Sequence, residues 1–198
     1  MKKEGLRTTC ISLGAAFLIS TPICHFAVQS WDNSPQIKFE HLPESVDWSH
    51  LSIEAKAHEI FERQELLDSY GVEVPQDIQT YCEQAQEEFN VCAELLEAIA
   101  FKESRYTETA EYKGCSGLMQ ISTRWHRDRM KKLGVSDIYD AQGNIRVGAD
   151  YLAELFELYD GDLYRVLMTY NGDTSKGVSE YAKDIAEISE ALERVHGK

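Results

Sequence analysis

Proline and positive charge are both scarce in this chain. Only four prolines occur in 198 residues, beside many Leu, Ala and Glu residues, and such a composition favours helices over sheets. The 20 Lys and Arg residues are outnumbered by 34 Asp and Glu residues, which gives a formal net charge of −14. A body with this charge repels nucleic acid and anionic lipid. We therefore expect a mainly α-helical protein whose partners do not include nucleic acid.

Metal-binding patterns of cysteine and histidine are also missing. The sequence contains five Cys and six His residues but no CxxC motif, and His126 has no metal partner at a useful spacing. Cys82, Cys92 and Cys115 follow the first thirty residues, and in an exported chain they allow one disulfide and one remaining thiol. No pair is assigned, and we expect neither a metal nor a cofactor.

A long uncharged run occurs at the N-terminus. After a basic start, residues 8–30 carry no Asp, Glu, Lys or Arg, which is the pattern of an export signal. Val28 and Ser30 suit the small positions of a cleavage site, but the run also approaches the roughly 20 residues that span a bilayer. Residues 1–30 are thus predicted to be a signal peptide or an uncleaved membrane anchor. In either case we expect the body of the protein to be exported to the cell envelope or beyond.

The rest of the chain shows mostly helical spacing. Residues 31–74 are predicted to form a tether and then an amphipathic helix over 53–70, which is either a stalk or an outer helix packed on the domain. After Gly71 and Pro75 the apolar pattern is dense, with a loop or small β-hairpin expected over 105–114. The further helices are predicted over residues 75–90, 92–104, 117–134, 144–161, 162–172 and 178–195.

One carboxylate falls where the helix over 92–104 should be apolar. At about 100° per residue, Leu96, Ile99 and Glu103 share one face, whereas Glu94 and Glu97 fall on the other, solvated side. A carboxyl group on a partly buried surface resists ionisation, so the pKa of Glu103 should rise. A carboxyl group that keeps its proton near neutral pH can protonate a leaving group.

Five segments in order resemble a known family: "ELLEAIAFKES", "GCSGLMQIS", "NIRVGADYL", "YRVLMTYNG" and "SEYAKDI". Together they resemble the lytic transglycosylase catalytic domain of the lysozyme superfamily, typified by the soluble lytic murein transglycosylases. The resemblance runs from about residue 75 to residue 192. It implies a lysozyme-like helical domain, which we predict over residues 75–198, with a cleft for the glycan strands of peptidoglycan.

The resemblance also implies roles for individual residues. The family's Glu-Ser pair falls on Glu103 and Ser104, so Glu103 is the implied catalytic acid and base. The Gly-Leu-Met-Gln motif ends at Gln120, which is implied to line the cleft, and the Tyr-Asn pair places Tyr170 near the bond that is cut. The residues implied to bind substrate are Ser104, Met119, Gln120, Tyr170 and Asn171. The segment around Asn144 and Gly148 is implied to be largely structural.

The implied reaction needs a single carboxyl group. In the family, the C6 hydroxyl of N-acetylmuramic acid attacks its own C1, and a 1,6-anhydro product forms without a second side chain as nucleophile. One alternative is a hydrolytic N-acetylmuramidase, which would use water and a second carboxylate. Glu108 or Glu111 could supply that carboxylate, because "AEYKGCSG" departs from the family pattern with Glu111 near the usual serine and Cys115 in place of alanine.

A second alternative is a wall-binding scaffold that keeps the fold without the activity. The expected partner in every case is the peptidoglycan glycan strand. The wall could be the cell's own, that of a competitor, or the barrier in the path of a secretion or conjugation apparatus. Residues 8–30 would tether the protein to the membrane if they are not removed.

Overall fold

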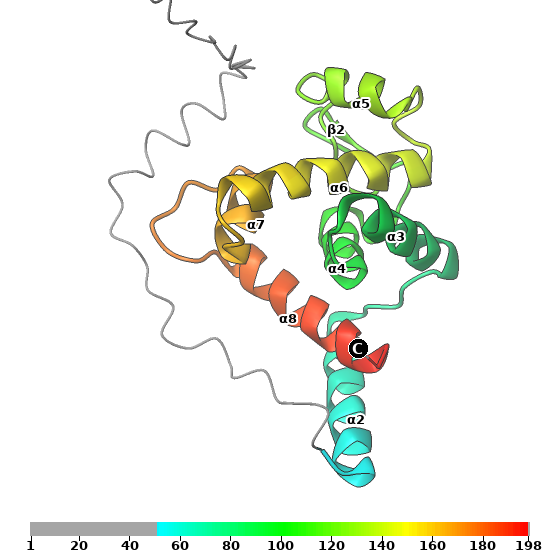
Figure 1. Ribbon diagram of the computed structural model, residues 1–198, viewed down its shortest axis with the longest axis vertical. Helices are drawn as coiled ribbons and strands as arrows, with labels where there is room; N and C mark the ends of the chain where they lie inside the picture. The colour runs from blue at the N-terminus through cyan, green and yellow to red at the C-terminus, as the bar shows by residue number, and fades with distance from the viewer. Residues whose placement is uncertain (1–50, 198) are drawn as a thin grey trace, which may run out of the picture. The chain divides into compact units, whose positions relative to one another are not determined.

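Helices make up most of the described chain. The computed structural model describes residues 51–197 (Figure 1). The predicted signal or anchor and the first part of the tether lie outside these residues. Among the residues described, no helix is both long and apolar enough to cross a membrane. The elements are α2 (Ile53–Tyr70), α3 (Gln76–Phe89), α4 (Ala93–Ser104), β1 (Glu111–Tyr112), β2 (Cys115–Ser116), α5 (Arg127–Leu133), α6 (Ala141–Leu158), α7 (Leu163–Asn171) and α8 (Glu180–Val195).

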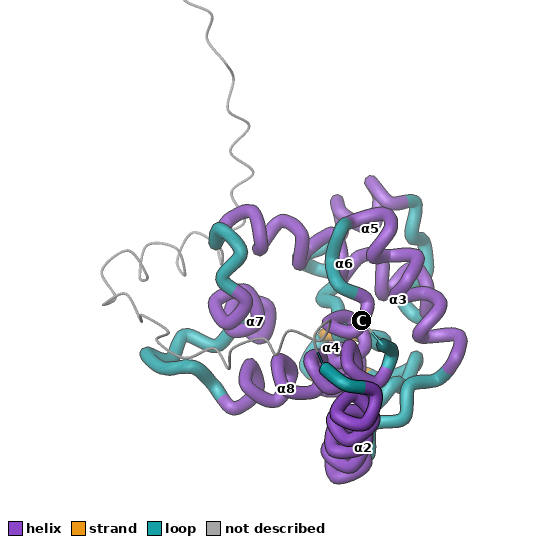
Figure 2. Tube along the Cα trace, turned by 60° about the horizontal axis from the view of Figure 1, so that its bottom comes forward, coloured by secondary structure: helices purple, strands orange, loops and turns teal. Residues whose placement is uncertain are grey.

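Helix α4 is the central element of this arrangement. It contacts α3, α6 and α8, which lie around it in both views (Figures 1 and 2). Every residue from Ala93 to Phe101 is buried. The prediction that Glu94 and Glu97 face solvent was therefore wrong, since their exposed fractions are 1% and 0%. A helix that is covered on all sides has no solvated face for a charged residue to occupy.

The buried carboxylate of Glu94 connects the start of α4 to the end of α8. Its Oε1 lies 3.1 Å from Nδ1 of His196, and the thiol of Cys92 donates a hydrogen bond of 3.1 Å to its Oε2. These partners replace the water that the carboxylate loses, because a charged group is buried at acceptable cost only when it is paired. Cys82, Cys92 and Cys115 are all free thiols, so the one disulfide that their number allowed is not formed.

Helix α2 packs against α8 (Figure 2). Of the two alternatives, it is therefore an outer helix of the domain and not a stalk. The guanidinium of Arg63 lies 3.3 Å from a carboxylate oxygen of Glu190, and the hydroxyl of Tyr70 donates a 2.7 Å hydrogen bond to Glu187. Leu67 is buried in this contact, whereas Phe61 stays 61% exposed. The amphipathic helix predicted over 53–70 is thus confirmed.

The helix predicted over 117–134 is much shorter in the structure. Only α5, from Arg127 to Leu133, is helical, and a tight turn precedes it. Ser116 and Ile121 bridge across this turn, with N–H to carbonyl distances of 3.0 and 2.9 Å. Gly117 and Gln120 have φ of +79° and +47°, which a right-handed helix excludes. Of the loop or small β-hairpin expected over 105–114, the hairpin is found as the antiparallel pair β1 and β2, which extends past 114 to Ser116.

The side chain of Asn144 on α6 holds this turn. It is fully buried, accepts a 2.7 Å hydrogen bond from the Met119 amide, and donates to the carbonyls of Ser116 at 3.0 Å and Ile138 at 2.8 Å. Met119 packs against Gly148, where an added Cβ would lie 2.8 Å from its terminal methyl carbon. Helix α6 therefore fixes the segment that runs from the hairpin to Gln120.

A substitution at Gly117 tests this clamp. A Cβ at Gly117 would lie 2.2 Å from Nδ2 of Asn144, and φ is +79° as well. We expect Gly117→Ala to lower the free energy of unfolding by about 2–4 kcal/mol, because strain and overpacking add. The control is Gly71→Ala, where φ is +72° and nothing lies within 4 Å, and a loss of about 1 kcal/mol is expected. Urea unfolding measures both, and equal losses would contradict the clamp.

Candidate active site

The carboxyl group of Glu103 lies on the last turn of α4, opposite the first turn of α8. Its side chain is partly buried, and the hydroxyl of Tyr181 donates a hydrogen bond of 2.5 Å to its Oε1. The side chain of Ser179 caps the start of α8, where its hydroxyl accepts from the amide of Ala182 at 3.3 Å, and so sets the orientation of the turn that carries Tyr181. The contact leaves Oε2 of Glu103 as the oxygen that can carry a proton.

Burial controls the ionisation of Glu103. It raises the pKa of the Glu103 carboxyl above its ordinary value of 4.5, against smaller opposing effects from the Tyr181 hydrogen bond and the charge of Lys102. The Lys102 ammonium is itself paired with Asp184 at 2.7 Å, which weakens its influence. The rise in pKa expected from the apolar face of the helix is therefore found, and its cause is loss of water.

Tyr170 lies close to the same carboxyl group. Its hydroxyl donates a 2.8 Å hydrogen bond to the carbonyl of Met119, in the turn that Asn144 holds. Burial, followed by the negative charge of Glu103, raises the pKa of Tyr170 far above its ordinary range. The same two causes raise the pKa of Tyr181. Both tyrosines are therefore neutral around Glu103.

The other residues implied to bind substrate occupy different positions. The hydroxyl of Ser104 donates to the carbonyl of Ala100 at 3.0 Å, and the side chain of Met119 is fully buried. Asn171 is exposed at the end of α7, and its side chain has a small lowering effect on the pKa of Tyr181, which burial raises overall. Ser104 and Met119 thus make contacts within the protein, whereas Asn171 lies at the surface near Tyr181. Their roles toward substrate stay predictions.

Gln120 braces the turn through its amide. Its Nε2 donates to the carbonyls of Ala110 at 3.2 Å and Gly117 at 2.9 Å. Its Oε1 is buried and accepts no hydrogen bond within the described part of the chain. The NH₂ group of Gln120 therefore holds the backbone of the turn, whereas its side-chain carbonyl oxygen has no donor among the described residues. Lining of the cleft by Gln120 stays a prediction.

Sequence reasoning did not single out Tyr181. The residue belongs to the segment "SEYAKDI", which contributed to the family resemblance, but nothing local marked its hydroxyl as part of a site. Its partner Glu103 is 78 positions away in the chain. Such a contact has no signature in the periodicity of either helix, so its position in a family segment was the one available signal.

A row of rings leads from the site to α5. The Tyr170 ring lies 5.6 Å from Tyr151 on α6, which lies 4.6 Å from the ring of His126. Burial first, and the positive charge of Arg129 second, lower the pKa of His126 to about 4. At neutral pH His126 is therefore uncharged, and its Nδ1 accepts a hydrogen bond of 3.4 Å from Nε of Arg129.

The two carboxylates considered for a hydrolytic mechanism are exposed. Glu108 lies in the loop after α4, and Glu111 lies on β1 with its side chain in solvent. Cys115 on β2 lies near enough to Glu103 for the charge of that carboxylate to act on its thiol. Burial first, and this charge second, raise the pKa of the thiol. The thiol is therefore protonated and a poor nucleophile. Within residues 51–197, no group of His, Cys, Asp or Glu side chains is arranged to hold a metal ion.

A family profile and curated relatives match this sequence. The profile of a family described as "Transglycosylase SLT domain" matches residues 80–188. The invasion protein IagB of Salmonella typhimurium strain SL1344 is 36% identical over 116 residues, which cover 52% of this chain and 71% of IagB. The peptidoglycan transglycosylase gp16 of Escherichia phage T7 is 31% identical over 137 residues, which cover 63% of this chain but only 10% of gp16.

A solved structure is also similar. An inactive mutant of the lytic transglycosylase Slt from Pseudomonas aeruginosa aligns with a TM-score of 0.48 and 16% identity. The alignment covers 71% of this chain and 28% of that chain. This chain thus spans more than two thirds of IagB but less than a third of the Slt structure.

The buried carboxyl group should cost stability at neutral pH. Because the folded-state pKa of Glu103 is raised above 4.5, the folded protein is favoured while the group is protonated, and this advantage is lost as pH rises through the folded-state pKa. We expect Glu103→Gln to raise the melting temperature at pH 7 and to have little effect below pH 4.5. Glu108→Gln, at an exposed carboxylate, is the control. A lower melting temperature for Glu103→Gln at pH 7 would contradict the burial cost.

Proposed function

Because the chain belongs to the transglycosylase SLT domain family, we propose that it is a peptidoglycan lytic transglycosylase in which Glu103 alone serves as acid and base. The observation that carries the proposal is the partly buried carboxyl group of Glu103, which has a raised pKa and receives a hydrogen bond from the neutral hydroxyl of Tyr181. The bond cut is the β-1,4 linkage between N-acetylmuramic acid and N-acetylglucosamine.

In the first step Glu103 acts as the acid. Since Oε1 accepts a hydrogen bond from Tyr181, the proton is carried on Oε2, which gives it to the glycosidic oxygen as the bond to C1 breaks. The carboxylate that results is stabilised by the same Tyr181 hydroxyl, because a hydrogen bond to a charged acceptor is stronger than one to a neutral acceptor. Tyr181 is thus a positioning residue whose contribution grows as charge develops on Glu103.

In the second step the Glu103 carboxylate acts as the base. It takes the proton of the C6 hydroxyl of N-acetylmuramic acid while that oxygen bonds to C1, which closes the 1,6-anhydro ring and restores the protonated acid. The nucleophile belongs to the same sugar, so the step gains from proximity and needs no second carboxylate. Tyr170, Asn171 and Gln120 are the residues proposed to hold the sugars beside Glu103, and Ser104 and Met119 support the turn of α4 and the backbone that accepts from Tyr170.

Hydrolysis is the second candidate, and the structure favours it less. Water attack at C1 would need a second carboxylate near the cleaved bond. Glu108 and Glu111 are both exposed to solvent, and neither shares the partly buried surroundings of Glu103. A wall-binding scaffold without activity gains nothing from a partly buried carboxyl group that lowers its stability. The burial of Glu103 therefore also supports activity.

The proposal includes export of the chain. Peptidoglycan lies outside the cytoplasm, and residues 8–30 form the uncharged run that would direct or anchor the protein. One relative is named an invasion protein and another a peptidoglycan transglycosylase, which supports a role in opening the wall for a secretion or conjugation apparatus. Cell fractionation followed by the mass of the chain separates a cleaved form that begins near residue 31 from an anchored form, and a cytoplasmic location would contradict export.

Digestion of purified sacculi tests the chemistry. We expect products with 1,6-anhydro ends, and Glu103→Gln should reduce the rate by about 10²–10⁴-fold because general acid catalysis is lost. Mass spectrometry identifies the ends of the products, and the amount of product released over time gives the rate. Glu108→Gln and Glu111→Gln should keep most of the activity. Reducing ends, together with loss of activity in either control, would establish hydrolysis instead.

The pH profile of Tyr181→Phe tests the positioning role. The hydroxyl of Tyr181 lowers the pKa of Glu103, so its removal should raise that pKa further. Activity requires the protonated acid, and its fall at alkaline pH should therefore move to higher pH in Tyr181→Phe, with a lower maximal kcat. Tyr139→Phe serves as the control and should leave the profile unchanged. A shift of the falling limb to lower pH would contradict the assigned hydrogen bond.

A further inference from the structure

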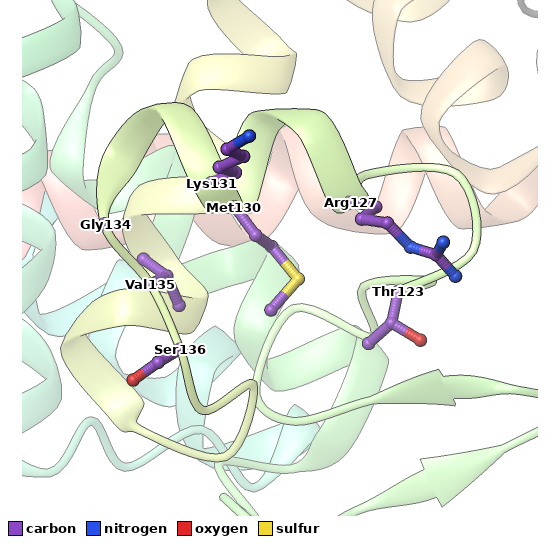
Figure 3. A pocket seen from close by; sticks show the side chains of 7 residues that line it. All are labelled: Thr123, Arg127, Met130, Lys131, Gly134, Val135 and Ser136. Atoms are coloured by element: carbon purple, nitrogen blue, oxygen red, sulfur yellow. The ribbon is translucent and has the colours of Figure 1, made fainter.

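A hollow beside α5 is separate from the Glu103 site. Its volume is about 480 Å³, and it lies between α5 and the turn that follows Gly134 (Figure 3). The Met130 side chain points into the hollow between Thr123 on one side and Val135 on the other, and Ser136 lies at the edge (Figure 3). The lining thus combines an apolar floor with two hydroxyl groups.

Positive charge gathers at this hollow although the chain as a whole is strongly acidic. Residues 124–132 contain five of the 20 Lys and Arg residues and only one carboxylate, Asp128, in a chain of net charge −14. Arg127 and Lys131 line the hollow, four residues apart on one face of α5. Asp128 is not part of the lining.

The cations of α5 divide between two faces. Arg129 pairs with Asp150 and Glu154 on α6, and the Lys132 ammonium lies 3.0 Å from Asp150, so these two are neutralised within the protein. No carboxylate of residues 51–197 pairs with Arg127 or Lys131. The face of α5 that lines the hollow therefore keeps its charge available for an anion from outside.

The hollow is close to the proposed site along the chain. Thr123 follows Gln120 by three residues, so their Cα atoms are at most about 11 Å apart at 3.8 Å per residue. If Gln120 holds a sugar, as proposed above, a group that branches from that sugar lies within this distance of Thr123. The overall charge of −14 repels an extended anionic surface, whereas a small anion can enter a local positive recess.

We infer that the hollow binds the stem peptide that branches from the muramic acid of peptidoglycan, with Arg127 and Lys131 taking its carboxylates. Met130 and Val135 suit the methyl groups of its alanine residues, and Thr123 and Ser136 offer hydroxyl groups to its backbone. The inference rests on the proposed function for its choice of substrate. Contacts of this exposed kind change affinity rather than the chemical step, so they should act on KM.

Binding is tested first without any cleavage. The full-length protein is labelled with ¹³C at its methionine methyl groups and titrated with free stem tetrapeptide. Met130 lines the hollow, whereas Met119 and Met168 are buried and act as internal references. We expect the Met130 signal to move, and to stop moving in Arg127→Gln/Lys131→Gln or at high salt, since exposed charge contacts are screened.

The inference is overturned if the Met130 signal does not move. It is also overturned if the peptide moves Met119 instead, which would place binding in the turn beside Tyr170. Vesicles of phosphatidylglycerol are a further probe. If the vesicles but not the peptide shift the Met130 signal, the hollow binds lipid and the stem-peptide site is overturned.

Kinetics on two substrates completes the test. Glycan strands that carry stem peptides are compared with strands from which an amidase has removed them. Arg127→Gln/Lys131→Gln should raise KM about three- to tenfold on the first substrate alone, with kcat unchanged, as two exposed ionic contacts would predict. The control Lys56→Gln/Arg194→Gln also removes one Lys and one Arg, from α2 and from the last turn of α8, and should leave KM unchanged on both substrates.

An equal loss on both substrates, or no loss on either, overturns the stem-peptide site. If the wild-type protein cleaves neither substrate, the proposed function fails, and the Met130 titration still decides whether the hollow binds the peptide.

Discussion

The contact between Glu103 and Tyr181 replaces water at the one carboxyl group whose protonation the proposed chemistry needs. It forms because α8 packs along α4 and brings its first turn over the end of the central helix. Burial raises the pKa of Glu103, while the hydrogen bond from the Tyr181 hydroxyl opposes part of that rise and holds Oε1 in place. Helices α3 and α6 pack against the same central helix.

The position of Tyr170 depends on a second polar contact. Asn144 is buried on α6 and binds the Met119 amide, while the Met119 carbonyl accepts from Tyr170. A buried polar side chain of this kind is stable only when its hydrogen bonds are made, so it permits one arrangement of the turn. Glu103 is thus placed by helix packing, and Tyr170 is placed by backbone hydrogen bonds that α6 controls.

Apolar periodicity predicted most of the helices and the unusual position of Glu103, because burial of an apolar face determines both. It failed at Glu94 and Glu97, since periodicity assumes a solvated side and α4 has none. It also failed over 117–126, where left-handed residues at Gly117 and Gln120 form a turn that apolar spacing does not reveal. Tyr181 was missed because a contact across 78 positions has no local pattern.

The most direct test of a protonated Glu103 is its own titration. The side-chain carboxyl carbon is followed by ¹³C NMR from pH 3 to pH 9, and Glu103→Gln identifies its signal. A midpoint clearly above the ordinary value of 4.5 is expected, because burial outweighs both the Tyr181 hydrogen bond and the charge of Lys102. A midpoint at or below 4.5 would show an ionised carboxylate in the resting protein and would contradict Glu103 as the acid.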